Sequence, residues 1–192
     1  HRQRAPRADL AFPPEHIDLP AIGESWACHM VPAGAPGTRR EPLVRALAAS
    51  GTGGVLQLRS GTDESLLGNA MLDWLCERAT AALAPQLSAL AHSCGVRYRR
   101  LQIRRQRTRW GSCSARGTIS LNCCLLFHRP AVVRYLLVHE LSHLAHMNHS
   151  ARFWQQVERH EPQWREHDRE LSAGWSQVPG WALRSLRARG AT

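Results

Sequence analysis

The stretch His139-Glu140-Leu141-Ser142-His143 is the most informative part of this 192-residue chain. It has the pattern H-E-x-x-H, and the apolar residues on both sides predict a largely buried helix that begins at Pro130. Residues four apart share one face of a helix and lie about 6 Å apart along its axis, so the two imidazoles can bind one metal ion. Glu140 projects to the side, where it can contact a metal-bound water. If the histidines formed only hydrogen bonds, a buried Glu140 would lack a partner, which is unfavourable.

A hydrolytic zinc site usually has three protein ligands and one open position. The candidates for the third ligand are His146 and His149. His146 faces the same side of the expected helix as His139 but lies about 10.5 Å further along the axis, which disfavours a shared ion. His149 lies where we expect one helix to end and the next to begin, so the chain reverses there. We therefore favour His139, His143 and His149 as the metal ligands.

The sequence around this helix predicts an α+β fold. Apolar residues with helical spacing extend from Asp63 to about Cys94, and we expect Pro85 to end or kink that helix. Alternating apolar and polar residues predict strands at 96–105 and 117–121, and further helices are expected at 151–161 and 162–171. The H-E-x-x-H helix should therefore pack with other helices against a small β-sheet.

We expect three regions along the chain. Residues 1–60 form a Pro-rich N-terminal arm with a possible β-hairpin at 43–59, residues 61–173 form the metallohydrolase domain, and residues 174–192 form a basic, loosely attached C-terminal tail. No run approaches the roughly 18 apolar residues of a membrane-spanning helix. The six cysteines include no C-x-x-C pair, which favours a reducing, cytoplasmic location.

The positive charge is concentrated in one region. All 25 basic residues are arginines, against 15 acidic residues, and no acidic residue occurs between Arg78 and His139. Seven arginines fall within residues 97–109. They can form a solvated strand face, or a surface for an anionic partner such as nucleic acid or a nucleotide.

Several motifs accompany the H-E-x-x-H helix at characteristic distances. They are residues 108–114 (TRWGSCS), 117–122 (GTISLN), 138–143 (VHELSH), 148–150 (NHS) and the pair Phe153-Trp154. Together they resemble the YgjP-like metallopeptidases, relatives of the SprT and WLM zinc-dependent peptidase-like domains, over about Asp63 to Leu171. The resemblance implies a compact zincin-like domain, Zn²⁺ held by the positions of His139, His143 and His149, Glu140 as catalytic base, and a β-rich N-terminal portion.

We therefore predict a zinc metallopeptidase that acts on a protein or peptide substrate. Zinc would lower the pKa of a bound water, and Glu140 would take its proton and later return it to the leaving group. Arg109 or Asn122 would bind the substrate by stabilising the developing oxyanion, and the strand around 118–122 would align an extended peptide at its edge. The family is also associated with nucleotide (UTP) pyrophosphatase activity, which we keep as an alternative together with a nucleic-acid-associated, SprT-like protease.

Overall fold

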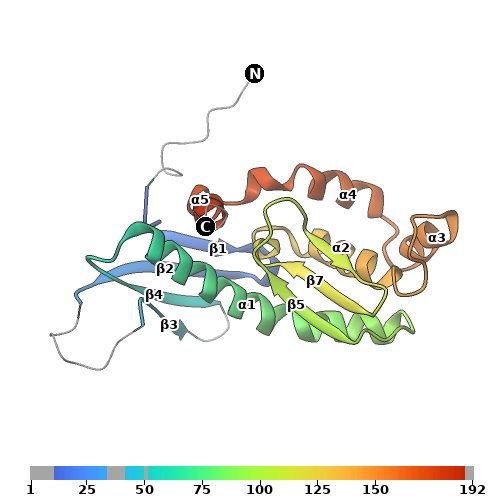
Figure 1. The fold of residues 1–192 in the computed structure, drawn as a ribbon, viewed down its shortest axis with the longest axis horizontal. Helices are drawn as coiled ribbons and strands as arrows, with labels where there is room; N and C mark the ends of the chain where they lie inside the picture. The colour runs from blue at the N-terminus through green and yellow to red at the C-terminus, as the bar shows by residue number, and fades with distance from the viewer. Residues whose placement is uncertain (1–10, 34–41, 50–51, 189–192) are drawn as a thin grey trace, which may run out of the picture. The chain divides into compact units, whose positions relative to one another are not determined.

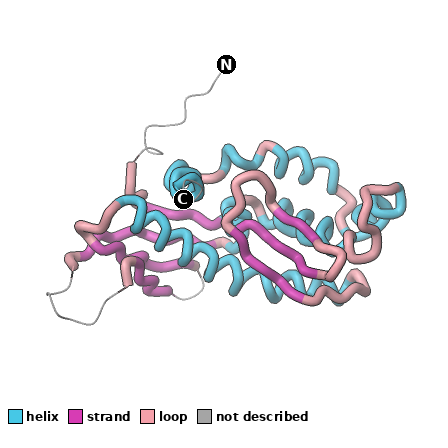
Figure 2. The backbone as a smooth tube through the Cα atoms, viewed as in Figure 1, coloured by secondary structure: helices cyan, strands magenta, loops and turns pink. Residues whose placement is uncertain are grey.

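The computed structural model describes residues 11–33, 42–49 and 52–188 of the chain. Helices and two separate β-sheets make up these residues, so the predicted α+β class is confirmed (Figure 2). The chain divides into two compact units. The first contains the described parts of residues 1–19, 23–74 and 178–192, and the second contains residues 20–22 and 75–177.

The first unit contains a four-stranded sheet. Its strands are β1 (His16–Leu19), β2 (Glu24–Val31), β3 (Val44–Ala49) and β4 (Gly53–Arg59), in the order β1-β2-β4-β3. Strands β2 and β4 are parallel, and the other two pairs are antiparallel. The β3–β4 pair is the hairpin expected within 43–59, and β1 and β2 extend it into a sheet. The proline content suggested an irregular arm instead of these two strands, whereas the family resemblance implied a β-rich N-terminal portion. The prolines near β1 flank this strand and do not interrupt it.

Two helical segments belong to the first unit. Helix α1 (Glu64–Ser93) begins there, and the carboxylate of Asp63 caps it by accepting hydrogen bonds from the backbone N–H groups of Ser65 and Leu66. Helix α5 (Gly180–Ala188) buries Trp181 among other side chains. The end of the chain was expected to be a loose tail, but these apolar residues give it a helix with a buried face.

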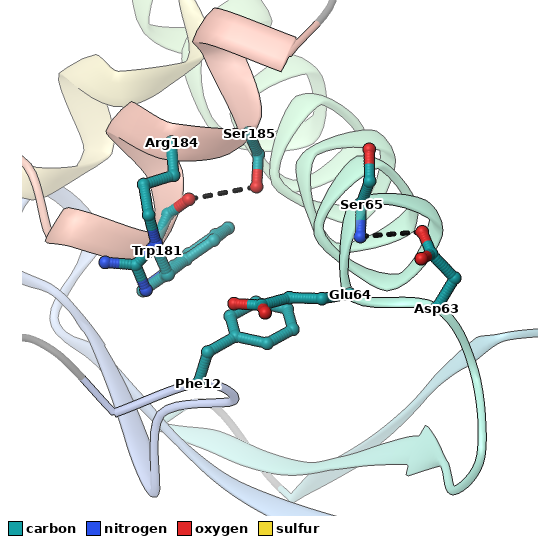
Figure 3. A pocket seen from close by; sticks show the side chains of 7 residues that line it. All are labelled: Phe12, Asp63, Glu64, Ser65, Trp181, Arg184 and Ser185. Carbon is teal, nitrogen blue, oxygen red and sulfur yellow. Dashed lines mark hydrogen bonds between the residues drawn. The ribbon is translucent and has the colours of Figure 1, made fainter.

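A pocket of about 350 Å³ lies between these helix segments in the first unit (Figure 3). Phe12 and Trp181 supply apolar surface, and Glu64 and Arg184 supply opposite charges. The hydroxyl of Ser185 donates a hydrogen bond to the carbonyl of Trp181 rather than into the pocket.

Helix α1 continues through Pro85 without a break, although a break or kink was expected there. A proline inside a helix removes one backbone donor and costs about 3 kcal/mol. Leu83 and Leu87, on either side of Pro85, are fully buried. Burial of such side chains contributes about 2 kcal/mol each, enough to offset the loss.

The second unit contains a three-stranded sheet formed by β5 (Arg100–Arg104), β6 (Gly111–Cys113) and β7 (Thr118–Asn122) (Figure 1). The order is β5-β7-β6, with β5 parallel and β6 antiparallel to β7. Strand β7 is therefore central. Our expectation that 118–122 offers a free edge was wrong, because both sides of β7 are already paired. The edge strands of this sheet are β5 and β6.

Helix α2 (Pro130–Ser142) packs against strand β6 of this sheet. It also packs against two further helices, α3 (Ala151–His160) and α4 (Trp164–Ser172). Short 3-10 helices, η3 (Cys123–Phe127) and η4 (Gly174–Gln177), precede α2 and follow α4. Helix α2 ends at Ser142, earlier than expected, because the predicted helix included His146. The backbone N–H groups of Leu144 and Ala145 bind the carbonyls three residues before them, which tightens the chain into turns. No helix within the described ranges is long and apolar enough to span a lipid bilayer.

Candidate active site

The end of α2 and the following turn bring three histidines together. The nearest nitrogens of His139, His143 and His149 all lie within 4.8 Å of one another. The Nε2 atoms of His139 and His149 are 3.2 Å apart. Nitrogen ligands of a tetrahedral zinc ion lie about 3.3 Å apart, since each zinc–nitrogen bond is about 2.0 Å. The donor set therefore fits a metal ion of this kind, and His146, the other candidate, is not part of the cluster.

The electrostatics of the cluster favour neutral imidazoles, the form that binds metals. Burial, together with the smaller effect of the nearby His143 and His149, lowers the pKa of His139 to about 3. Burial also lowers the pKa of His143, partly opposed by the carbonyl of His146. That carbonyl lies 3.2 Å from Nδ1 of His143, so it can hold the Nδ1–H and leave Nε2 available to a metal.

Aromatic side chains from α3 pack around the cluster. The ring of Phe153 is fully buried, with its centroid 4.6 to 5.0 Å from those of all three histidines. Trp154 stacks on His149 at 5.6 Å, and Trp164 of α4 stacks on Trp154 at 4.1 Å. These contacts restrict the orientation of His149, the histidine that is not attached to a helix.

Glu140 lies beside the cluster with its carboxyl group buried against β6. Only 4% of the residue is exposed, and no described residue forms a hydrogen bond to Oε2. Burial raises the pKa of this carboxyl to about 8, although the positive charge of Arg109 opposes the shift. A buried carboxyl atom without a protein partner is unfavourable unless water or an ion completes its surroundings. The orphaned oxygen is therefore evidence for a site that binds further groups.

Gly111 provides the space that this carboxyl group occupies. A Cβ atom at Gly111 would lie 2.6 Å from Oε1 of Glu140 and 3.0 Å from its Cδ. Sequence reasoning included Gly111 in a motif but gave it no role. The only signal was a single glycine directly after Trp110 in the motif TRWGSCS.

The two predicted substrate-binding residues differ in their surroundings. Arg109 is exposed and close enough to influence the charge of Glu140. Asn122 is fully buried, and its amide nitrogen donates to the carbonyls of Gln106 (2.8 Å) and Arg109 (3.0 Å). Its Oδ1 atom accepts from the N–H of Cys124. Asn122 therefore holds the loop that carries Arg109, and neither of its amide hydrogens remains for a substrate.

Comparison with known protein families identifies the domain. The model of the YgjP-like metallopeptidase domain family matches residues 39–173, so the chain belongs to this family. One solved structure, the zymogen of the metallopeptidase abylysin from Pyrococcus abyssi, is 29% identical over 45% of this chain and 90% of its own, with a TM-score of 0.42. No curated protein matches the chain. With the histidine cluster, the family indicates a metal-binding, metallopeptidase-like hydrolase.

We predict that the cluster binds one divalent ion. Replacement of His139, His143 or His149 by Ala should each weaken Zn²⁺ binding by at least about 100-fold, because each removes one of three ligands. His146→Ala is the matched control, since only its backbone carbonyl contacts the cluster. Titration calorimetry against a competing chelator measures these affinities. Equal affinity in His149→Ala and the intact chain would contradict the assignment.

We also predict a strong coupling between Gly111 and Glu140. Gly111→Ala should destabilise the protein by about 1–3 kcal/mol, because the added methyl group overlaps the carboxyl group. In a Glu140→Ala background the same change should cost much less, because the overlapping atoms are gone. Urea unfolding of the four variants of this cycle measures the coupling, and additive costs would show that the overlap does not limit position 111.

Proposed function

We propose that this chain is a zinc-dependent metallopeptidase that hydrolyses peptide bonds, with Glu140 as general base. The observation that carries this proposal is the place of the Glu140 carboxyl group. It is buried, lacks a hydrogen bond to one oxygen, packs against Gly111 of the edge strand β6, and belongs to the residue that directly follows His139 of the cluster. The candidate base is therefore close both to the candidate metal site and to a strand edge that could bind a peptide.

Three imidazoles support zinc as the ion. Neutral imidazole suits Zn²⁺, whereas Mg²⁺ and Ca²⁺ prefer carboxylate and carbonyl oxygens. When bound, zinc acidifies water and polarises a carbonyl group. The charge of the ion also favours the ionised form of the nearby Glu140, as a base requires.

The protein residues then perform the proton transfers. Glu140 takes a proton from water as the water oxygen bonds to the carbonyl carbon of the substrate. It returns that proton to the amine nitrogen as the carbon–nitrogen bond breaks, so a carboxylic acid and an amine are released. Arg109, which is exposed and electrostatically coupled to Glu140, would stabilise the negative charge on the carbonyl oxygen.

Strand β6 is suited to align the substrate. The carbonyl of Trp110 and the N–H of Ser114 bind β7 at either end of β6. Because hydrogen bonds alternate along an antiparallel strand, the backbone groups of Gly111 and Cys113 face away from β7. In the described part of the chain β6 pairs with β7 alone, so an extended peptide can add to this side next to Glu140.

A second candidate function, association with nucleic acid, is favoured by one observation. The arginine surface consists of Arg97, Arg99, Arg100, Arg104, Arg107, Arg109 and Arg116, all of them exposed. None forms an ion pair with an acidic residue within the described ranges, unlike Arg129, Arg134 and Arg165. Unpaired arginines suit phosphate groups. They would equally suit the phosphates of UTP, the alternative small substrate.

We also propose a cytoplasmic location. All six cysteines lie in described parts of the chain, and no disulfide bond joins any two of them. Cysteines that form no disulfide are typical of a reducing compartment.

Glu140→Gln should keep zinc affinity within about threefold while peptide hydrolysis falls by at least about 100-fold, because the amide cannot act as a base. A fluorescent unfolded protein is the substrate for one assay, and UTP with detection of pyrophosphate is the substrate for the other. The intact chain should cleave the first and not the second, and a chelator should abolish cleavage. Cleavage of UTP alone, or full activity in Glu140→Gln, would overturn the proposal.

Nucleic-acid binding should depend on the arginine surface and on salt. Arg99→Ala combined with Arg100→Ala and Arg104→Ala should weaken binding of a labelled oligonucleotide by about tenfold or more at 50 mM salt, and binding by the intact chain should fall steeply towards 200 mM. Arg152→Ala with Arg159→Ala, exposed positions on α3, is the charge control. Anisotropy measures the affinities, and equal losses in both variants would indicate only a net charge effect.

A further inference from the structure

A chain of hydrogen-bonding groups leads from the histidine cluster to helix α4. The hydroxyl of Tyr135 lies 3.3 Å from Nδ1 of His139 and 2.7 Å from Oδ1 of Asp168. Tyr135 belongs to α2, one turn before His139, and Asp168 belongs to α4. Tyr135 is 1% exposed, so water does not compete freely for its hydroxyl group.

The chemistry of the three groups determines the direction of both hydrogen bonds. An ionised carboxylate can only accept, so the single hydrogen of the phenol is donated to Asp168. The phenolic oxygen is then left as an acceptor towards His139. Nδ1 of His139 must therefore be the protonated nitrogen, and Nε2 retains its lone pair. Nε2 is also the atom that lies 3.2 Å from Nε2 of His149, within the cluster.

We infer that Tyr135 and Asp168 are positioning residues that hold His139 in the Nδ1-protonated tautomer and aim Nε2 at the metal. This inference rests on the proposed metal site and deepens it by naming the residues that prepare one ligand before any ion arrives. Partners of this kind that orient a ligand typically change metal affinity by 10- to 100-fold when they are removed.

A neighbouring contact fixes the distance between the two helices. Arg134, next to Tyr135, lies 3.0 Å from the carboxylate of Glu161, which in turn lies 3.3 Å from Nδ1 of His167. His167 adjoins Asp168 and is 3% exposed. Two adjacent residues of α2 therefore make contacts in this region: Arg134 contacts Glu161, just before α4, and Tyr135 contacts Asp168, within α4. The two contacts together fix the position of the hydroxyl group of Tyr135 relative to Asp168.

The competing explanation is that the hydrogen bond from Tyr135 to Asp168 only holds α2 and α4 together. The tautomer of His139 distinguishes the two explanations, because a purely structural bond would not affect it. In Asp168→Ala the phenol loses its acceptor and is free to donate to Nδ1 of His139, which favours the tautomer with Nε2 protonated. In Asp168→Asn the amide oxygen still accepts from the phenol, so the native tautomer should persist. Tyr135→Phe keeps the buried ring but removes the hydroxyl group.

The experiment uses the full-length chain in two states. In the metal-free protein, ¹⁵N chemical shifts of the imidazoles should show Nδ1-protonated His139 in the intact chain and in Asp168→Asn, and a shift towards the Nε2-protonated form in Asp168→Ala. Zinc affinity, measured against a chelator, should fall by about 10- to 100-fold in Asp168→Ala and Tyr135→Phe, and by less than about threefold in Asp168→Asn. Glu166→Gln, which removes an exposed charge from the same helix, is the control.

Unchanged tautomer and unchanged zinc affinity in Asp168→Ala and Tyr135→Phe, even with reduced stability, would overturn the inference. An equal loss of affinity in Asp168→Asn and Asp168→Ala would also overturn it, because charge rather than an acceptor would then be responsible. These outcomes differ from a failure of the proposed function. An intact chain that binds zinc but cleaves no peptide would leave the tautomer and affinity results standing.

Discussion

Helix α2 withdraws two ionisable side chains from water, burying Glu140 and partly burying His139, and the cost of that burial determines what surrounds them. Removal from water keeps the imidazole neutral and makes the carboxyl group harder to ionise. Buried polar atoms also require partners. His139 obtains one from Tyr135, whereas one oxygen of Glu140 obtains none from the described protein. Under the proposed function, water and substrate would bind on the side of the helix where Glu140 lies.

The three-histidine cluster also requires the chain to change direction after α2. A helix that continued to residue 147 would carry the chain away from His139. The turns that begin at Ser142 instead place the carbonyl of His146 against His143 and return His149 to the cluster. Phe153, one turn into α3, then fills the space behind all three rings. The third histidine is therefore held by a loop and by aromatic packing rather than by a helix of its own.

The centre could be predicted from the sequence to the extent that it depends on local spacing. Helix geometry converts the separation of His139 and His143 into a distance, and the reversal near Ser150 explains why His149 can join them. Features that depend on long-range pairing were not accessible. The contact between Tyr135 and Asp168 joins residues 33 apart, and no local pattern connects them. Likewise, the central place of β7 follows from the pairing of β5 and β6 on its two sides.

Competition between local preference and packing explains the remaining differences. Pro85 disfavours helix locally, yet buried leucines on either side hold α1 together. The prolines near β1 suggested an irregular arm, but β1 and β2 carry buried residues such as Ile17 and Trp26 that contribute to a core. In both cases the spacing of apolar residues, alternate in the strands and helical in α1, was a better predictor of secondary structure than the proline content.

The shortness of β6 limits how much of a bound chain it could recognise. Three residues span about 10 Å, and only Gly111 and Cys113 direct backbone groups outward. A bound polypeptide would thus contact β6 through only two or three of its own residues. These contacts would mainly be hydrogen bonds of backbone atoms, which every sequence has. Under the proposed function, such an edge would favour broad selectivity. The accessibility and local unfolding of the target, rather than a long consensus motif, would then decide which bonds reach the carboxyl group of Glu140.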